Sequence, residues 1–134
     1  MIGIVIVTHG LLGQEILKTA EFIVGSLEGC ITVSVDSGRG PDAIRQAIDQ
    51  AIKNVNRGAG VLVLTDMFGG TPSNISLSFL EEGRVEVLTG VNLPMLIKAV
   101  QLRSKMSLTE AAQAIGDYGR KSITVAGEIL GGGR

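Results

Sequence analysis

Short runs of apolar, mostly β-branched residues alternate along this chain with segments in which apolar residues recur every three to four positions. The runs predict buried strands at residues 2–7, 31–35, 61–64, 85–88 and 123–126. The spacing between them predicts helices at 12–27, 41–55, 72–82 and 94–100, and a last helix after a capping box of Ser107 and Glu110. Strands that alternate with helices favour an α/β fold with an open, doubly wound and mostly parallel sheet.

The first and third runs are the most uniformly apolar, so we expect them to lie side by side at the centre, in a flavodoxin-like strand order. The 134 residues contain no internal repeat or linker, which predicts a single domain over 1–134. A net charge of −1 gives no electrostatic reason to expect nucleic acid or an anionic membrane as a partner. A single cysteine, no basic leader and no run of membrane-spanning length indicate a cytoplasmic protein.

His9, the only histidine, follows the first apolar run directly, and Asp66 follows the third. Either residue alone would more often be structural. The carboxyl ends of parallel strands meet at one edge of the sheet, however, so we expect the imidazole and the carboxylate to lie within reach of each other. A carboxylate that accepts a hydrogen bond from one ring nitrogen fixes the tautomer and leaves the other nitrogen free to attack. The pair therefore predicts a histidine nucleophile.

Gly69, Gly70 and Thr71 come shortly after Asp66, at the predicted start of a helix. Two glycines allow a tight turn with several amide protons pointing the same way, which predicts an anion site. Thr71 is the expected N-cap residue, and its hydroxyl could instead donate to a bound phosphoryl oxygen. We expect Asn74 and Asn92 to tie the loops of this edge to one another in a structural role. Arg39, the only cation near the edge, is interpreted as a solvated surface residue.

Several common sites are missing from the sequence. It has no phosphate-binding loop of the Walker type, no dinucleotide-binding glycine spacing and no Gly-x-Ser-x-Gly elbow. With one histidine and one cysteine we expect no metal site, and nothing indicates an organic cofactor. A nucleophilic histidine, an orienting carboxylate and an anion-binding loop together fit covalent capture of a phosphoryl group.

Three segments in order, Thr8–Gly10, Asp66–Asn74 and Gly90–Met95, closely resemble the IIA component of the mannose/fructose/sorbose family of the bacterial phosphoenolpyruvate-dependent sugar phosphotransferase system. The resemblance covers essentially the whole chain. It implies a phosphotransferase in which His9 accepts a phosphoryl group from the phosphocarrier HPr, on Nε2 with Nδ1 facing Asp66, and passes it to a IIB protein or domain. It also implies that Thr71 and the glycine amides hold the phosphoryl oxygens.

The same resemblance implies a homodimer whose last strand runs antiparallel in the sheet of the other subunit, and residues 122–126 fit that part. The chain lacks the fused IIB domain of the larger mannose proteins, so a separate IIB chain is the expected acceptor, and contact with the membrane is expected only through the permease. Two alternatives stay open: a regulatory phosphorelay or interaction module, and the phosphoryl-donating subunit of a dihydroxyacetone kinase. The segments 69–74 and 90–95 speak against the kinase subunit.

Overall fold

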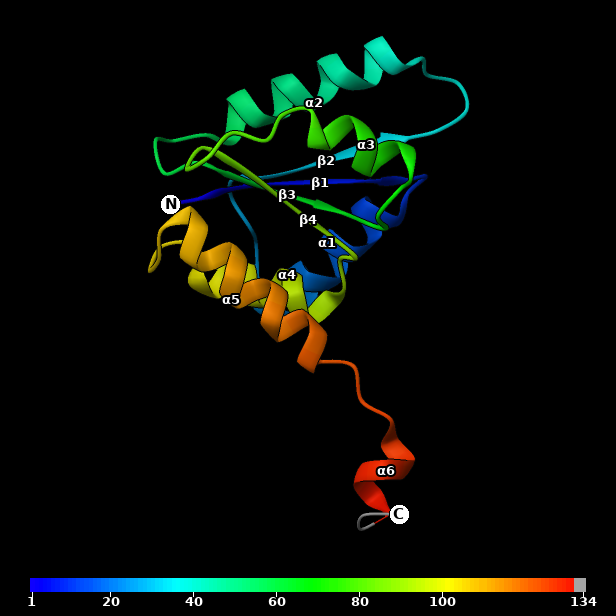
Figure 1. Cartoon of the computed structure of the whole chain (residues 1–134), viewed down its shortest axis with the longest axis vertical. Coiled ribbons are helices and arrows are strands. Elements are labelled where there is room, and N and C mark those ends of the chain that lie inside the picture. The colour runs from blue at the N-terminus through cyan, green and yellow to red at the C-terminus, as the bar shows by residue number, and fades with distance from the viewer. Residues whose placement is uncertain (132–134) are drawn as a thin grey trace.

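The computed structural model describes residues 1–131, which form an open sheet of four parallel strands between two layers of helices (Figure 1). The strands are β1 (Gly3–His9), β2 (Cys30–Val35), β3 (Val61–Thr65) and β4 (Val85–Thr89). Their spatial order is β2-β1-β3-β4, and all three pairs are parallel. The predicted α/β class and the central, adjacent placement of the first and third strands are confirmed.

Six helices complete the described part of the chain, namely α1 (Leu12–Val24), α2 (Pro41–Val55), α3 (Thr71–Leu77), α4 (Leu93–Leu102), α5 (Leu108–Lys121) and α6 (Ala126–Leu130). In Figure 1, α2 and α3 cover one face of the sheet and α1, α4 and α5 cover the other. Successive strand residues point to opposite faces, so each face has its own apolar core. Val61 and Val63 pack in the α2/α3 core, and Leu62 and Leu64 in the opposite one. None of these helices is both long and apolar enough to cross a bilayer.

Helix α3 is shorter than the predicted helix 72–82. It ends at Leu77, and the amides of Ser78, Phe79 and Leu80 each bond to the carbonyl three residues earlier. This tighter winding is typical of a helix end. Phe79 and Leu80 extended the apolar pattern beyond the point where the helical hydrogen bonds stop, and the prediction of a helix to residue 82 is wrong for that reason.

The predicted strand at 122–126 is also absent from residues 1–131. The chain leaves α5 at Lys121, runs away from the sheet and forms α6 from Ala126 (Figure 1). The side chains of Ile123 and Val125 are 78% and 59% exposed. Their β-branched character gave the strand signal, but a strand also needs a neighbour with which to hydrogen-bond. Within the described part of this single chain, the segment has none.

Arg103, which no sequence motif singles out, joins three parts of the fold. It is only 5% exposed, and its guanidinium donates hydrogen bonds to the carbonyls of Ile2 (2.9 Å), Glu28 (2.7 Å) and Gly29 (2.9 Å). These contacts fix the end of α4 to the start of β1 and to the turn before β2. Within residues 1–131, Arg103 is the donor to the carbonyls of Ile2 and Glu28, and it is a second donor to the Gly29 carbonyl, which also accepts from the Ile4 amide at 3.0 Å.

Replacing Arg103 with methionine is expected to lower the free energy of unfolding by about 2–4 kcal/mol, because three hydrogen bonds are lost and the carbonyls of Ile2 and Glu28 are left without a donor. Urea denaturation measures the change. Arg84 is the control, since its side chain is 69% exposed and makes only a long contact with Glu81. Arg84→Met should change stability by less than about 0.5 kcal/mol. Equal effects of the two substitutions would contradict the role given to Arg103.

Candidate active site

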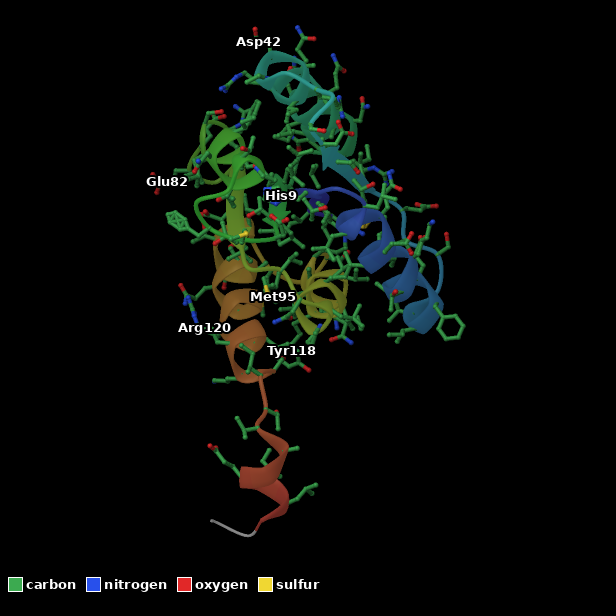
Figure 2. The ribbon with its side chains drawn as sticks, turned by 90° about the vertical axis from the view of Figure 1, so that its right-hand side faces the viewer. His9, Asp42, Glu82, Met95, Tyr118 and Arg120 are labelled. Carbon is green, nitrogen blue, oxygen red and sulfur yellow. The ribbon has the colours of Figure 1, made fainter. Side chains whose placement is uncertain are left out.

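His9 and Asp66 meet at the carboxyl ends of the two central strands. His9 is the last residue of β1, and Asp66 directly follows Thr65, the last residue of β3. The Nδ1 atom of His9 lies 2.7 Å from Oδ2 of Asp66, and the backbone N–H of His9 donates to the same oxygen at 2.9 Å. In Figure 2 the ends of the strands point toward the viewer, with His9 among them. The structure thus contains the predicted juxtaposition of the two residues.

The carboxylate of Asp66 is held in its ionised form. Burial by itself would raise the pKa of Asp66, but hydrogen bonds from the backbone and ring of His9 and from the Met67 amide (2.9 Å to Oδ1) lower the pKa below its ordinary value. An anionic oxygen next to Nδ1 favours the tautomer with the proton on Nδ1. The lone pair of the neutral imidazole then lies on Nε2.

The imidazole of His9 lies against the backbone of Gly70. A β-carbon at Gly70 would come within 2.8 Å of Cε1 and 3.4 Å of Nε2, so only glycine leaves the ring its present position. Gly69 has φ +88°, a conformation that favours glycine as well. The side chain of His9 is 51% exposed, with the Nε2 side of its ring next to the glycine turn.

Thr71 is the first residue of α3, and the N-cap is Gly70, which has no side chain to cap the helix. The predicted N-cap role of Thr71 is therefore wrong, because the helix begins at Thr71, one residue before the predicted start at 72. Thr71 is exposed at the end of this turn. The amides of Gly69, Gly70 and Thr71 donate to no group within residues 1–131, so they are available to an anion.

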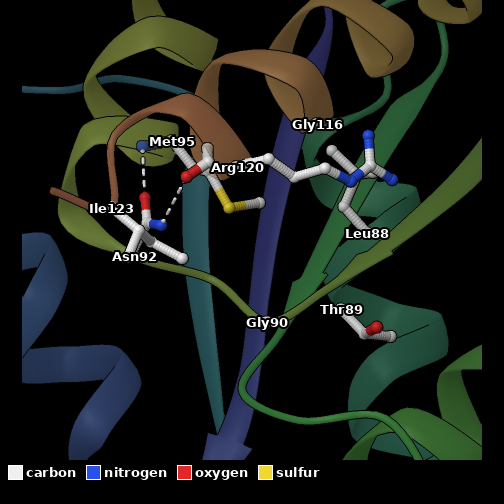
Figure 3. Close-up of a pocket in the computed structure, with 9 residues that line it drawn as sticks. Leu88, Thr89, Gly90, Asn92, Met95, Gly116, Arg120 and Ile123 are labelled. Atoms are coloured by element: carbon white, nitrogen blue, oxygen red, sulfur yellow. Dashed lines mark hydrogen bonds between the residues drawn. The ribbon is translucent and has the colours of Figure 1, made fainter. Parts of the chain in front are cut away.

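Asn74 and Asn92 do not tie the loops together as expected. Asn74 Nδ2 donates to the carbonyl of Gly69 at 3.3 Å, which holds the glycine turn. Asn92 is the N-cap of α4: its Oδ1 accepts from the Met95 amide at 2.9 Å, and its Nδ2 donates to the Gly119 carbonyl at 3.3 Å (Figure 3). Asn92 therefore joins α4 to α5.

Backbone groups link the loops instead. The carbonyl of Thr65 accepts hydrogen bonds from the amides of Gly90 (3.0 Å) and Val91 (2.9 Å). Arg39, on the loop after β2, is exposed and donates to the carbonyl of Ser34 at 3.2 Å, which agrees with a surface role. In the described part of the chain, no group of three His, Cys, Asp or Glu side chains could hold a metal ion.

Four exposed apolar residues, called here the apolar rim, lie in the segments that directly follow His9 and Asp66, and the sequence patterns did not predict their exposure. Leu11 and Leu12 follow β1, and Met67 and Phe68 follow Asp66; their exposed fractions are 61%, 51%, 57% and 69%. The sequence feature that could have identified these four residues is their position directly after His9 and Asp66. Exposed apolar side chains that cluster around a reactive group are typical of a surface that binds another protein.

Comparison with known proteins places the chain in a family. Residues 3–116 match the family model described as PTS system fructose IIA component. The fructose-specific EIIA component of Bacillus subtilis is 31% identical over 97% of this chain and 90% of its own length. The mannose-specific EIIAB component of Escherichia coli is also 31% identical, over 91% of this chain, which spans only 38% of that longer protein.

Solved structures agree with this assignment. The EIIA component from Streptococcus agalactiae has a TM-score of 0.86 and 29% identity, over 94% of this chain and 98% of that structure. The mannose/sorbose-specific IIA subunit from Enterococcus faecalis has a TM-score of 0.82 and 26% identity, over 92% and 93%. The fold, the site residues and these relatives lead to one assignment: the chain belongs to the family of the PTS system fructose IIA component, in the mannose/fructose/sorbose class.

Proposed function

We propose that this chain is a cytoplasmic phosphocarrier of the sugar phosphotransferase system. It accepts a phosphoryl group from HPr on Nε2 of His9 and transfers it to a IIB protein or domain. The observation that carries this proposal is the 2.7 Å contact between Nδ1 of His9 and Asp66, which leaves Nε2 beside the glycine turn. The relatives are sugar-system components, which favours this role over that of a dihydroxyacetone kinase subunit.

In the proposed transfer, the lone pair of Nε2 forms a bond to phosphorus while the bond between phosphorus and the donor breaks. The electrons of the broken bond remain with the donor. The proton on Nδ1 stays in its hydrogen bond with Asp66. The phosphorylated ring carries a positive charge, which the Asp66 carboxylate balances at 2.7 Å. The amides of Gly69, Gly70 and Thr71 and the Thr71 hydroxyl donate to the phosphoryl oxygens.

The apolar rim of Leu11, Leu12, Met67 and Phe68 supports a protein as phosphoryl donor and acceptor. A small phosphorylated metabolite would gain little from four exposed apolar side chains outside the site. A protein surface that covers the rim would bury these side chains and bring its own phosphoryl group to His9. HPr and a IIB protein would then use the same surface in turn.

The direct test is to incubate the chain with phosphoenolpyruvate, enzyme I and HPr. We expect an acid-labile phosphoryl adduct that disappears when a IIB domain is added. A chain that forms no adduct would contradict the proposed function. An adduct that no IIB protein discharges would favour a regulatory module instead.

Asp66→Asn is expected to slow phosphoryl transfer by between about 100-fold and about 10⁴-fold, the larger figure being the scale seen when an orienting carboxylate next to a catalytic histidine becomes an amide. The amide can donate to Nδ1 and so favours the tautomer without a lone pair on Nε2. Rapid-quench measurement of adduct formation gives the rate. Asp36→Asn is the matched control, because Asp36 follows β2 at the same edge of the sheet and is exposed. Identical rates in the two variants would count against the orienting role.

We also propose that two copies of the chain form a homodimer through residues 122–126. At its outer edge β4 forms one antiparallel bridge, between Val85 and Glu81, and beyond Val85 no strand within residues 1–131 pairs with this edge. Beside it lies a cavity of about 140 Å³ lined by Leu88, Gly116, Arg120 and Ile123, among others (Figure 3). The exposed Ile123 and Val125 could pair there as an antiparallel strand of a second copy. The double variant Ile123→Asp/Val125→Asp should sediment as a monomer where the native chain sediments as a dimer. A native monomer, or a dimer in both proteins, would contradict this arrangement.

A further inference from the structure

Two hydroxyl groups beneath the proposed active site have no hydrogen-bond partner. Thr65 and Ser73 are both fully buried, and within residues 1–131 their Oγ atoms bond to nothing. Other buried hydroxyls in the same region do have partners: Ser76 donates to the Pro72 carbonyl at 2.6 Å, and Thr8 accepts from the Gly13 amide at 2.7 Å. A buried polar group without a partner destabilises the state in which it occurs, so each such group calls for an explanation.

Both hydroxyls belong to the layer between β3 and α3. Thr65 follows Val61 and Val63 at two-residue spacing, so its side chain lies on the face of the sheet that carries the α2/α3 core. Ser73 is in the first turn of α3, and Ile75 of the same helix packs in that core. The segment from Asp66 to Gly70, called here the 66–70 loop, connects the end of β3 to the start of α3. Thr65 therefore directly precedes this loop, and Ser73 lies in the helical turn that follows it.

The backbone at both ends of the 66–70 loop is already fixed. The Thr65 carbonyl accepts two amides, from Gly90 and Val91, and the Gly70 carbonyl accepts the Asn74 amide at 2.9 Å. Between these points, the loop contains Gly69 in a left-handed conformation. The N–H and C=O groups of a trans peptide unit point in opposite directions. The carbonyls of Gly69 and Gly70 already accept hydrogen bonds from Asn74. The carbonyl of Phe68, in the same peptide unit as the Gly69 amide, accepts none within residues 1–131. When the Gly69 amide turns outward to an anion at His9, this carbonyl turns inward.

We propose that Thr65 and Ser73 are positioning residues of the phosphorylated state. Their hydroxyls donate to the inward-turned carbonyl of Phe68 once the Gly69 amide binds the phosphoryl group. The resting state leaves both hydroxyls unpaired and the loaded state pairs them, so they shift the exchange equilibrium toward the loaded chain. This inference rests on the proposed function of His9.

The test compares the equilibrium of phosphoryl exchange with HPr and the melting temperature of the resting protein. Thr65→Val and Ser73→Ala are each expected to shift the equilibrium about fivefold toward phosphorylated HPr, the equivalent of about 1 kcal/mol for one hydrogen bond. The melting temperature of the resting variants should be unchanged or raised, because each substitution removes an unpaired hydroxyl. Thr65→Ser keeps the hydroxyl and should retain the native equilibrium.

Ser76→Ala is the matched control, since Ser76 is a fully buried serine of the same helix whose hydroxyl already has a partner. It should not move the exchange equilibrium. An equilibrium equal to that of the native chain in both Thr65→Val and Ser73→Ala, or an equal shift in Ser76→Ala, would overturn the inference alone. A native chain that takes no phosphoryl group from HPr would overturn the proposed function and this inference with it.

Discussion

His9→Gln is expected to abolish loading of the chain by phosphorylated HPr, a loss of at least about 10⁴-fold, the scale seen when a catalytic nucleophile is removed. The chain has no second histidine that could replace it. Glutamine keeps a polar side chain of similar length, and the native imidazole is 51% exposed, so little packing is lost. Labelling from radioactive phosphoenolpyruvate, with enzyme I and HPr present, measures the effect.

The fold of the His9→Gln variant has to be shown intact by circular dichroism and by its unfolding midpoint. Leu12→Ala, at the apolar rim, is a useful comparison, because weaker docking lowers the rate without removing the acceptor nitrogen. Undiminished labelling of the glutamine variant would mean that another residue accepts the phosphoryl group, contrary to the proposed mechanism.

Gly70→Ala is expected to slow loading by about 100-fold, because a misplacement of reacting atoms by about 1 Å has effects of that size. The new β-carbon would lie 2.8 Å from Cε1 of His9, so the ring or the glycine turn has to move. The backbone itself tolerates alanine, since Gly70 has φ −83° and ψ 167°. The effect therefore arises from the contact with the imidazole and not from backbone strain.

Gly40 provides a closely matched control for Gly70. It is the N-cap of α2, with φ −74° and ψ 163°, and like Gly70 it precedes a helix with proline in its first turn. A β-carbon at Gly40 would meet no atom within 4 Å. Gly40→Ala should leave the loading rate unchanged. If both alanine variants load at the native rate, the ring of His9 does not depend on Gly70.

The amino-acid pattern was sufficient to predict the four parallel strands and the position of the two central site residues. Apolar runs and helical spacing are local patterns, and the parallel strands that they imply bring the residues after β1 and β3 to one edge. His9 and Asp66 could therefore be paired on the strength of strand order alone. The close approach of the His9 ring to Gly70 could not be predicted, because it depends on the conformation of the glycine turn.

The remaining features depend on contacts that the local pattern does not contain. Arg103 resembles an ordinary surface residue in the sequence, and only the fold brings three distant carbonyls around it. Residues 122–126 have the composition of a strand, but the described part of one chain offers no neighbour for it. Nothing in the sequence distinguishes Thr65 and Ser73 from other residues with hydroxyl groups. Only the structure shows that both are buried and that their hydroxyls have no partner within residues 1–131.

In the proposed mechanism, Nε2 of His9 carries the phosphoryl group while Nδ1 keeps its proton for Asp66. Nitrogen-15 and phosphorus-31 NMR of the chain loaded by HPr tests it most directly, because a one-bond coupling identifies the nitrogen bound to phosphorus. We expect a phosphorus bond to Nε2 of His9 and a protonated Nδ1. A phosphoryl group on Nδ1, or on any residue other than His9, would contradict it.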